Sequence, residues 1–178
     1  MWIAEGFIQC EKYGRSLFEL GESYFNELIN RSMIQPIQDP LSGMVNRCRI
    51  HDMVLDLIRS LSSEENFITI LSDMDSTSPS NTIRRLSLQN GKKSHVMAQA
   101  TRSLLQHARS VVIFPSAVAQ VPAAGSCRFL RVLDLEHCNL SHTDSLKYLG
   151  NLYQLRYLRL YSMHISQLPE EIGNLQFL

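Results

Sequence analysis

The C-terminal half of the chain repeats one pattern of apolar and polar positions, L-x-x-L-x-L. The two clearest copies begin at Leu130 and Leu155, and weaker copies begin at Ile83 and Ala108. The steps between these first positions are 25, 22 and 25 residues, within the interval of about 20–29 residues that is typical of leucine-rich repeats. One such strand cannot bury its own apolar face, whereas stacked copies can. The pattern therefore predicts parallel strands stacked in a solenoid at a step of about 22–25 residues.

The segments between the strands also recur. Gly150-Asn151-Leu152 returns as Gly173-Asn174-Leu175, 23 residues later. The chain stops at Leu178, where a further copy would start, without the polar cap that closes a solenoid. We therefore expect the chain to be a piece of a longer protein.

The N-terminal third has a different rhythm, that of an amphipathic helix. Residues 16–32 place Leu17, Leu20, Tyr24 and Leu28 on one helical face. This spacing predicts a helix that buries those four side chains.

Two short extended runs follow, at residues 33–37 and 44–50. Turn-forming residues between them, including Asp39, Pro40 and Gly43, predict a β-hairpin. A second amphipathic helix is predicted from Asp52, with an apolar stripe wide enough to belong to a core. That stripe consists of Met53, Val54, Leu57, Ile58 and Leu61.

Together these elements predict an α+β fold, in which a small winged-helix-like domain precedes the start of a leucine-rich-repeat solenoid. Residues 72–82 are poor in apolar side chains and rich in Ser, Asp and Pro, as linkers are. The predicted organisation is a winged-helix-like domain at 1–71, a linker at 72–82 and repeats at 83–178.

The net charge of zero hides an uneven distribution. Residues 1–75 carry twelve acids and six bases, whereas residues 76–133 carry eight bases and no acid. The basic stretch is either a polar surface that happens to be basic or a docking face for an acidic partner. The residues of this predicted basic strip are Arg84, Arg85, Lys92, Lys93, Arg102 and Arg109.

Signals for catalysis, metals and membranes are missing from the sequence. There is no glycine-rich phosphate loop, no H-E-x-x-H and no G-x-S-x-G. Cys10, Cys48, Cys127 and Cys138 form no C-x-x-C pair, which favours reduced thiols in a cytosolic protein. No apolar run reaches the ~18 residues that a membrane span needs. We expect neither an enzyme nor a metal site.

One dipeptide suggests a binding role. His51-Asp52 lies between an extended run and a predicted helix. An Asp there can cap the helix start, and the unpaired N–H groups and positive dipole end of a helix also suit a phosphate. A neighbouring histidine can donate a ring N–H to a phosphate oxygen. From the residues alone, the structural interpretation is favoured: Asp52 only caps the helix and His51 only fills a turn.

Three segments resemble plant NLR disease-resistance proteins, intracellular immune receptors with coiled-coil, NB-ARC and leucine-rich-repeat domains. They are W-I-A-E-G-F-I at 2–8, Y-F-N-E-L-I-N-R-S-M-I at 24–34 and C-R-I-H-D-M-V-L-D-L-I at 48–58. I-R-R-L-S-L at 83–88 resembles the opening of the family's repeat domain, and L-P-E-E-I-G-N-L at 168–175 resembles its repeat connector. The resemblance covers nearly the whole chain, from the end of NB-ARC into the first repeats.

The family's Met-His-Asp signature maps onto Ile50-His51-Asp52, with Ile in place of Met. The resemblance implies that His51 senses the β-phosphate of ADP in the full-length protein and that Asp52 supports it. It also implies ADP or ATP as cofactor of the full-length family, although the P-loop is absent here and the segment alone should need no cofactor. Implied partners are the receptor's own NB-ARC and coiled-coil domains and a pathogen effector or guarded host protein. A cytoplasmic location follows from the same resemblance.

Two other functions compete with the immune-receptor interpretation. A winged helix beside a basic segment can bind nucleic acid, but the helix from Asp52 to Leu61 carries only one base, Arg59. A free-standing leucine-rich-repeat scaffold without nucleotide binding is the second alternative.

Overall fold

The computed structural model of the chain describes residues 1–9, 14–40, 43, 45–71, 83–89, 105–114, 127–136, 146–161 and 167–178. Two compact units make up this structure. One contains Trp2 and Gly6–Asn66, and the other contains Met1, Ile3–Glu5 and Phe67–Leu178. A short helix, α1 (Trp2–Glu5), contributes residues to both units. The predicted linker at 72–82 lies outside the described residues.

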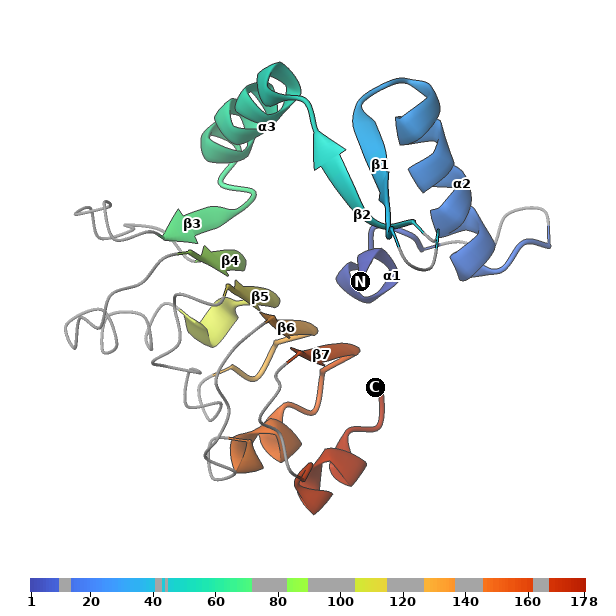
Figure 1. The fold of residues 1–178 in the computed structure, drawn as a ribbon. Helices are drawn as coiled ribbons and strands as arrows, with labels where there is room; N and C mark the ends of the chain where they lie inside the picture. The colour runs from blue at the N-terminus through green and yellow to red at the C-terminus, as the bar shows by residue number, and fades with distance from the viewer. Residues whose placement is uncertain are drawn as a thin grey trace. The chain divides into compact units, whose positions relative to one another are not determined.

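The first unit holds two helices and a hairpin (Figure 1). Its elements are α2 (Leu17–Asn30), β1 (Ile34–Gln38), β2 (Val45–Ile50) and α3 (Asp52–Glu64). The predicted order of helix, hairpin and helix is therefore confirmed.

Helix α2 begins with a capping box. The Glu19 N–H donates to Ser16 Oγ at 3.3 Å, and the Ser16 N–H donates back to Glu19 Oε2 at 2.8 Å. These bonds satisfy backbone groups that the first helical turn leaves without partners. Ser32, just beyond the helix, has a φ of 56°, and this left-handed conformation is a common way for a helix to end.

The buried side of α2 differs from the prediction at one position. Leu17, Leu20 and Leu28 are half-buried as expected, but the Tyr24 side chain is 41% exposed. Phe25 is half-buried instead, and its ring lies 6.3 Å from that of Trp2. The inner face is centred one residue further round the helix because Trp2 packs there.

The hairpin pairs β1 and β2 in antiparallel register, from Ile34 opposite Ile50 to Gln38 opposite Val45. In the turn, the Gly43 N–H donates to the Asp39 carbonyl at 2.8 Å, and Gly43 has a φ of 66°. A side chain at that φ is disfavoured, so the predicted turn chemistry is confirmed at Gly43. Strand β2 ends one residue before His51 and thereby sets the start of α3.

The second unit is a stack of parallel strands (Figure 1). In order they are β3 (Thr69–Leu71), β4 (Arg85–Leu88), β5 (Ser110–Ile113), β6 (Val132–Glu136) and β7 (Tyr157–Tyr161). Short 3₁₀ helices lie between or after strands, at η1 (Leu105–His107), η5 (Lys147–Asn151) and η6 (Glu170–Asn174). The sequence did not predict β3, because Thr69-Ile70-Leu71 carries no L-x-x-L-x-L pattern.

The ladder positions form the core of this unit. In register, Leu86, Val111, Leu133 and Leu158 occupy one row across the sheet. The first residues of the four copies are between 0% and 3% exposed, and they are Ile83, Ala108, Leu130 and Leu155. Leu149, Leu152 and Leu175, from the recurring connectors, are buried in the same cluster. All four predicted copies and the predicted fold class are thus confirmed.

A histidine-capped helix and a column of arginines

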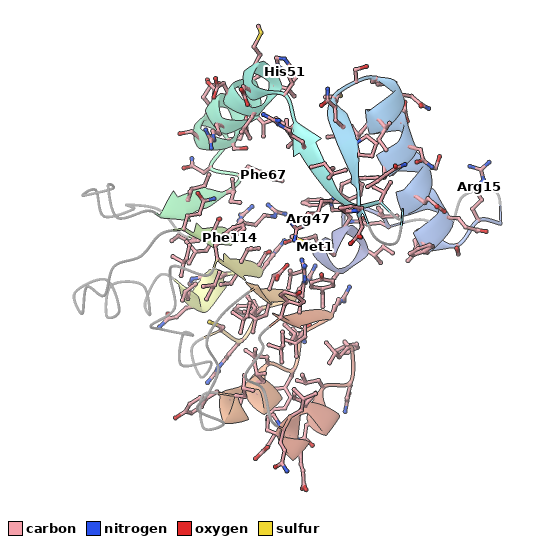
Figure 2. All side chains as sticks on the ribbon, viewed as in Figure 1. Met1, Arg15, Arg47, His51, Phe67 and Phe114 are labelled. Atoms are coloured by element: carbon pink, nitrogen blue, oxygen red, sulfur yellow. The ribbon has the colours of Figure 1, made fainter. Side chains whose placement is uncertain are left out.

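His51 stands at the N-terminus of α3, and Figure 2 shows it there. Its backbone is extended, with φ −65° and ψ 140°, and its Nδ1 atom accepts the Met53 N–H at 3.3 Å. The histidine is therefore the N-cap of the helix. In a neutral imidazole whose Nδ1 accepts a hydrogen bond, the proton resides on Nε2. The side chain is exposed, so a donor nitrogen is available on the solvent side of the cap.

The cap was expected at Asp52, and this part of the prediction is wrong. Asp52 is the first residue of α3, within its first turn, and it is exposed. The N-cap position, with its extended backbone, is occupied by His51, and the Met53 N–H donates to His51 Nδ1. Asp52 instead places a negative charge in the first turn of α3, where the helix dipole makes it favourable.

The apolar stripe of α3 is the second correction. We expected this stripe to be part of a hydrophobic core, but four of its five side chains are exposed. Met53, Leu57, Ile58 and Leu61 are 77%, 59%, 41% and 51% exposed. Only Val54 and Leu55 are half-buried among the apolar residues of this helix. The periodicity correctly predicted a helix with an apolar face, but not what covers that face.

The predicted basic strip is only partly described. Arg84 and Arg109 are exposed, whereas Lys92, Lys93 and Arg102 lie outside the described residues. Arg85 differs from Arg84 and Arg109 because it forms an ion pair: its Nε donates to Glu5 Oε2 at 3.0 Å. Its guanidinium also lies 4.3 Å from the centre of the Phe67 ring. Arg85 is thus held inside its unit, while Arg84 and Arg109 face solvent.

Arg84 and Arg109 belong to a longer column that sequence reasoning missed. Residues 84, 109, 131 and 156 are all arginine, each one position before the first residue of a strand. The backbone places them one above another. The Arg109 N–H donates to the Arg84 carbonyl at 2.7 Å, the Arg131 N–H to the Arg109 carbonyl at 2.8 Å, and the Arg156 N–H to the Arg131 carbonyl at 2.8 Å. Their phasing, 25, 22 and 25 residues, is that of the leucine ladder and was visible in the sequence.

We call these four residues the arginine column. Neighbouring strands lie about 4.8 Å apart, so the backbones of these four arginines lie along roughly 15 Å at the start of the strands. Arg131 is half-buried and the other three are exposed. Among the described residues, no carboxylate is within ion-pair range of Arg84, Arg109 or Arg131. The Arg156 guanidinium lies 6.0 Å from the Phe177 ring.

Other features of the described residues do not suggest a different site. A shallow hollow of about 490 Å³ on α2 is lined by Glu19, Glu22 and Glu27 with Ser23, Asn26 and Asn30. Its carboxylates would repel a phosphate. The described part of the chain has no cluster of His, Cys, Asp and Glu suited to a metal ion. Nor does any described helix have the length and apolar character needed to cross a membrane.

Known protein families account for both units. Residues 1–58 match the family model of the disease resistance protein winged helix domain, and residues 107–178 match that of a leucine-rich repeat region. The rice (Oryza sativa subsp. japonica) disease resistance protein PIK6-NP is 37% identical over 99% of this chain. The probable disease resistance RPP8-like protein 2 of Arabidopsis thaliana is 33% identical, and rice disease resistance protein RGA5 is 32% identical, each over 99% of the chain.

The alignments cover only part of these relatives. The chain spans 17%, 20% and 16% of the length of the three proteins, respectively. The matched stretch contains a winged-helix domain followed by leucine-rich repeats, in the order that the structure has them. The chain therefore belongs to the plant NLR disease-resistance proteins, as the stretch in which the winged-helix domain is followed by leucine-rich repeats.

Proposed function

We propose that this stretch is the regulatory and recognition segment of a nucleotide-switched plant immune receptor that works in the cytoplasm. His51 senses ADP bound to the full-length protein, and the repeats hold the receptor inactive through contacts with its own upstream domains. The segment itself performs no catalysis. ADP or ATP is the cofactor of the whole receptor, held chiefly by residues upstream of this chain. The full-length receptor binds the pathogen effector or the guarded host protein.

The observation that carries the sensing role is the hydrogen-bonding state of His51. Its Nδ1 accepts from Met53, which leaves the protonated Nε2 on an exposed ring at a helix N-terminus. Helix N-termini bind phosphate groups through their free N–H groups and the dipole. A phosphate oxygen at that point would accept from Nε2 without breaking the cap. Asp52, in the first helical turn, supports the same helix start.

The exposed apolar stripe of α3 explains how the nucleotide state could change the packing of this helix against another domain. Met53 and Leu57 are 77% and 59% exposed, and contiguous apolar surface of this kind marks an interaction site. We propose that the upstream nucleotide-binding module of the receptor covers this face. Since the helix that carries the stripe is capped by His51, a phosphate bound at the cap would favour one packing of α3 over another.

The sensing role can be separated from simple capping by two substitutions in the full-length receptor. His51→Ala removes both the cap and the ring donor. His51→Asp keeps a strong capping side chain but places a negative charge where the phosphate would lie. We expect both variants to lose bound ADP and to raise basal signalling, measured by nucleotide content of the purified receptor and by cell death in leaves.

The same two variants of the 178-residue chain serve as the control for helix stability. There, only His51→Ala should destabilise α3, by about 1 kcal/mol. If full-length His51→Asp retains ADP as the unsubstituted protein does, His51 is a structural cap and the sensing role is wrong.

We propose that the arginine column is the docking surface for an acidic helix of the receptor's NB-ARC or coiled-coil domain. Its rungs are about 4.8 Å apart, close to the 5.4 Å pitch of an α-helix. A helix with carboxylates at i, i+3 or i+4, and i+7 can therefore present one acid to each of several arginines. Guanidinium–carboxylate pairs are among the stronger charged hydrogen bonds in proteins. The predicted strip extends to Lys92, Lys93 and Arg102, which we include in this proposal.

Charge reversal tests this docking. In the full-length receptor, Arg109→Glu combined with Arg131→Glu should weaken the closed form and raise basal signalling at least severalfold. Arg128→Glu is the matched control, because Arg128 is an exposed arginine of the same repeat outside the column. If basal activity stays unchanged in the double variant, or rises equally in the control, the arginine column does not contribute to autoinhibition.

A free-standing repeat scaffold is the alternative function. It is favoured by the core, since the buried hydrophobic cluster is formed entirely by residues from Ile83 to Leu175. The genomic sequence directly upstream discriminates between the two. A P-loop in the same reading frame supports the receptor, and an in-frame stop codon supports the scaffold.

A further inference from the structure

The sheet of the second unit has two faces, and one of them is buried in an unexpected way. The leucine rows face the hydrophobic core. The alternate rows, which face the opposite side, run Arg85–Ser110–Val132–Tyr157 and Ser87–Val112–Asp134–Arg159. In a bare solenoid this second face is open to solvent.

Burial along this second face changes abruptly between β6 and β7. On β4, β5 and β6, the exposures of Ser87, Ser110, Val132 and Asp134 are 5%, 4%, 0% and 5%, while Arg85 and Val112 are half-buried. On β7, the Arg159 side chain is 44% exposed and Tyr161 is 54% exposed. Four residues of a face that a bare solenoid leaves open are thus almost inaccessible to solvent. Another segment therefore covers this face of β4, β5 and β6 and leaves it open on β7.

The cover comes from the start of the chain. Met1 and Ile3–Glu5 belong to the same compact unit as the sheet. The Glu5 side chain is only 3% exposed and accepts the Arg85 Nε hydrogen at 3.0 Å. Met1 lies close enough to Glu5 and to Asp134 of β6 for electrostatic interaction with both carboxylates. Figure 2 shows Met1 beside these strands.

Arg85 is fixed on both sides by this arrangement. Its guanidinium lies over the Phe67 ring at 4.3 Å, and Nη1 donates to the Phe67 carbonyl at 3.4 Å. Stacking on an aromatic ring leaves the edge of a guanidinium free to bind a carboxylate. The Glu5 carboxylate accepts a hydrogen bond from Nε at that edge. The removal of one member of a buried ion pair leaves the other uncompensated, so Glu5 and Arg85 should act as a latch.

We propose that Ile3–Glu5 is the resident occupant of this face over β4, β5 and β6, held there by the Glu5–Arg85 ion pair. Binding of other molecules to this face is then confined to β7, where Tyr157, Arg159 and Tyr161 are accessible. When the Glu5–Arg85 ion pair breaks, this face of β4, β5 and β6 becomes accessible. This inference goes beyond the proposed function, because it holds whichever domain binds the arginine column and whether or not His51 senses ADP.

Cysteine accessibility tests the proposal in the 178-residue chain. Cys10, Cys48 and Cys138 are first replaced by serine, and Ser110→Cys is introduced as a nearly isosteric reporter on the covered face. Tyr161→Cys, in a separate chain, reports on the open end of the face. We expect alkylation at residue 110 to be at least about tenfold slower than at residue 161, because labelling there requires local opening.

Glu5→Lys should then raise the rate at residue 110 to within about threefold of that at residue 161, and leave residue 161 unchanged. The exchange of both partners, Glu5→Arg with Arg85→Glu, should restore protection. Cys127, which is buried in the repeats, reports in each sample that the core remains folded. Glu5→Gln replaces Glu5→Lys if Cys127 becomes reactive.

Two results would overturn the proposal. Rapid labelling at residue 110 in the chain with Glu5 intact would mean that the face is open. Full protection at residue 110 in both Glu5 variants would mean that the ion pair does not hold the cover.

Discussion

At the scale of single residues, His51 combines two roles on one imidazole ring. Its Nδ1 accepts the Met53 N–H and so stabilises the start of α3. Its other nitrogen is then the donor that an anion would meet. Capping with a histidine is uncommon, since Ser, Thr, Asp and Asn are preferred at this position. A residue that is not the best cap is consistent with selection for a second role.

The two described cysteines should differ sharply in reactivity. Burial raises the pKa of the Cys127 thiol to about 11, and Cys127 is 2% exposed. Since the thiolate is the reactive form, Cys127 should resist iodoacetamide at neutral pH until the repeats unfold. Cys48 is exposed and should be labelled readily. Peptide mass spectrometry after timed labelling measures both, and rapid modification of Cys127 in the folded chain would contradict its burial.

The capping box of α2 should make the stability of this helix depend on pH. The Ser16 N–H and then the Ser16 hydroxyl, both donating to the carboxylate, hold the pKa of Glu19 below its ordinary value of 4.5. A lowered pKa in the folded state means that the stabilisation is present above pH 4.5 and is lost as the pH falls through the lower value.

Glu19→Gln can still accept hydrogen bonds but cannot titrate. Acidification from about pH 5 to about pH 3 should therefore destabilise the unsubstituted helix more than the variant. Hydrogen exchange of the amides in the first turn of α2 measures the difference. Identical pH dependence of the two chains would exclude a contribution from this carboxylate.

At the scale of elements, the 3₁₀ helices η5 and η6 approach each other closely at a glycine. A Cβ atom on Gly150 would lie 2.5 Å from the Glu171 Cβ and 2.8 Å from the Glu171 carbonyl oxygen. Neither atom can move without a shift of the backbone. The equivalent position of the next connector, Gly173, has no atom within 4 Å of such a Cβ. The same motif thus meets two different environments.

Gly150→Ala should accordingly destabilise the repeats by about 1–3 kcal/mol, as overpacking does. Gly173→Ala is the matched control and should be neutral, or stabilising by up to about 1 kcal/mol through the unfolded state. Urea unfolding followed by circular dichroism compares the two variants. Equal effects would mean that the glycines are retained for backbone conformation and not for close packing.

At the scale of the whole molecule, the arginine column concentrates like charges on one surface. Exposed charges one rung apart repel each other, and like pairs on neighbouring strands destabilise a sheet by a few tenths to about 1 kcal/mol. The chain nevertheless has arginine at all four positions. Such an arrangement weakens the repeats in isolation, and an acidic partner would relieve the repulsion.

Neutralisation of the column should therefore stabilise the isolated chain. Arg109→Gln with Arg131→Gln should raise the urea midpoint at low ionic strength, and the gain should largely vanish near 1 M NaCl, where the Debye length is about 3 Å. Arg128→Gln, outside the column, should have little effect at either salt concentration. A gain that persists in high salt would have to come from packing and not from charge.

The local sequence determined the elements because their signals are local. Ser16 and Glu19 encode the start of α2, and Gly43 encodes a turn. The leucine ladder encodes strands whose core positions are buried, except for Leu88, Leu158 and Leu160, which are half-buried against the same core. The resemblance pointed to His51, although the atom that caps the helix is His51 Nδ1 and not the Asp52 carboxylate.

Only the tertiary structure decided which faces are covered. The same helical periodicity occurs in α2 and α3, yet the α3 stripe is exposed, and Phe25 replaces Tyr24 on the inner face of α2 because Trp2 packs there. Arg85 differs from its neighbour Arg84 because Glu5, 80 residues away, and Phe67 lie against it. Periodicity is a property of one segment, whereas burial depends on a second segment whose position the first does not encode.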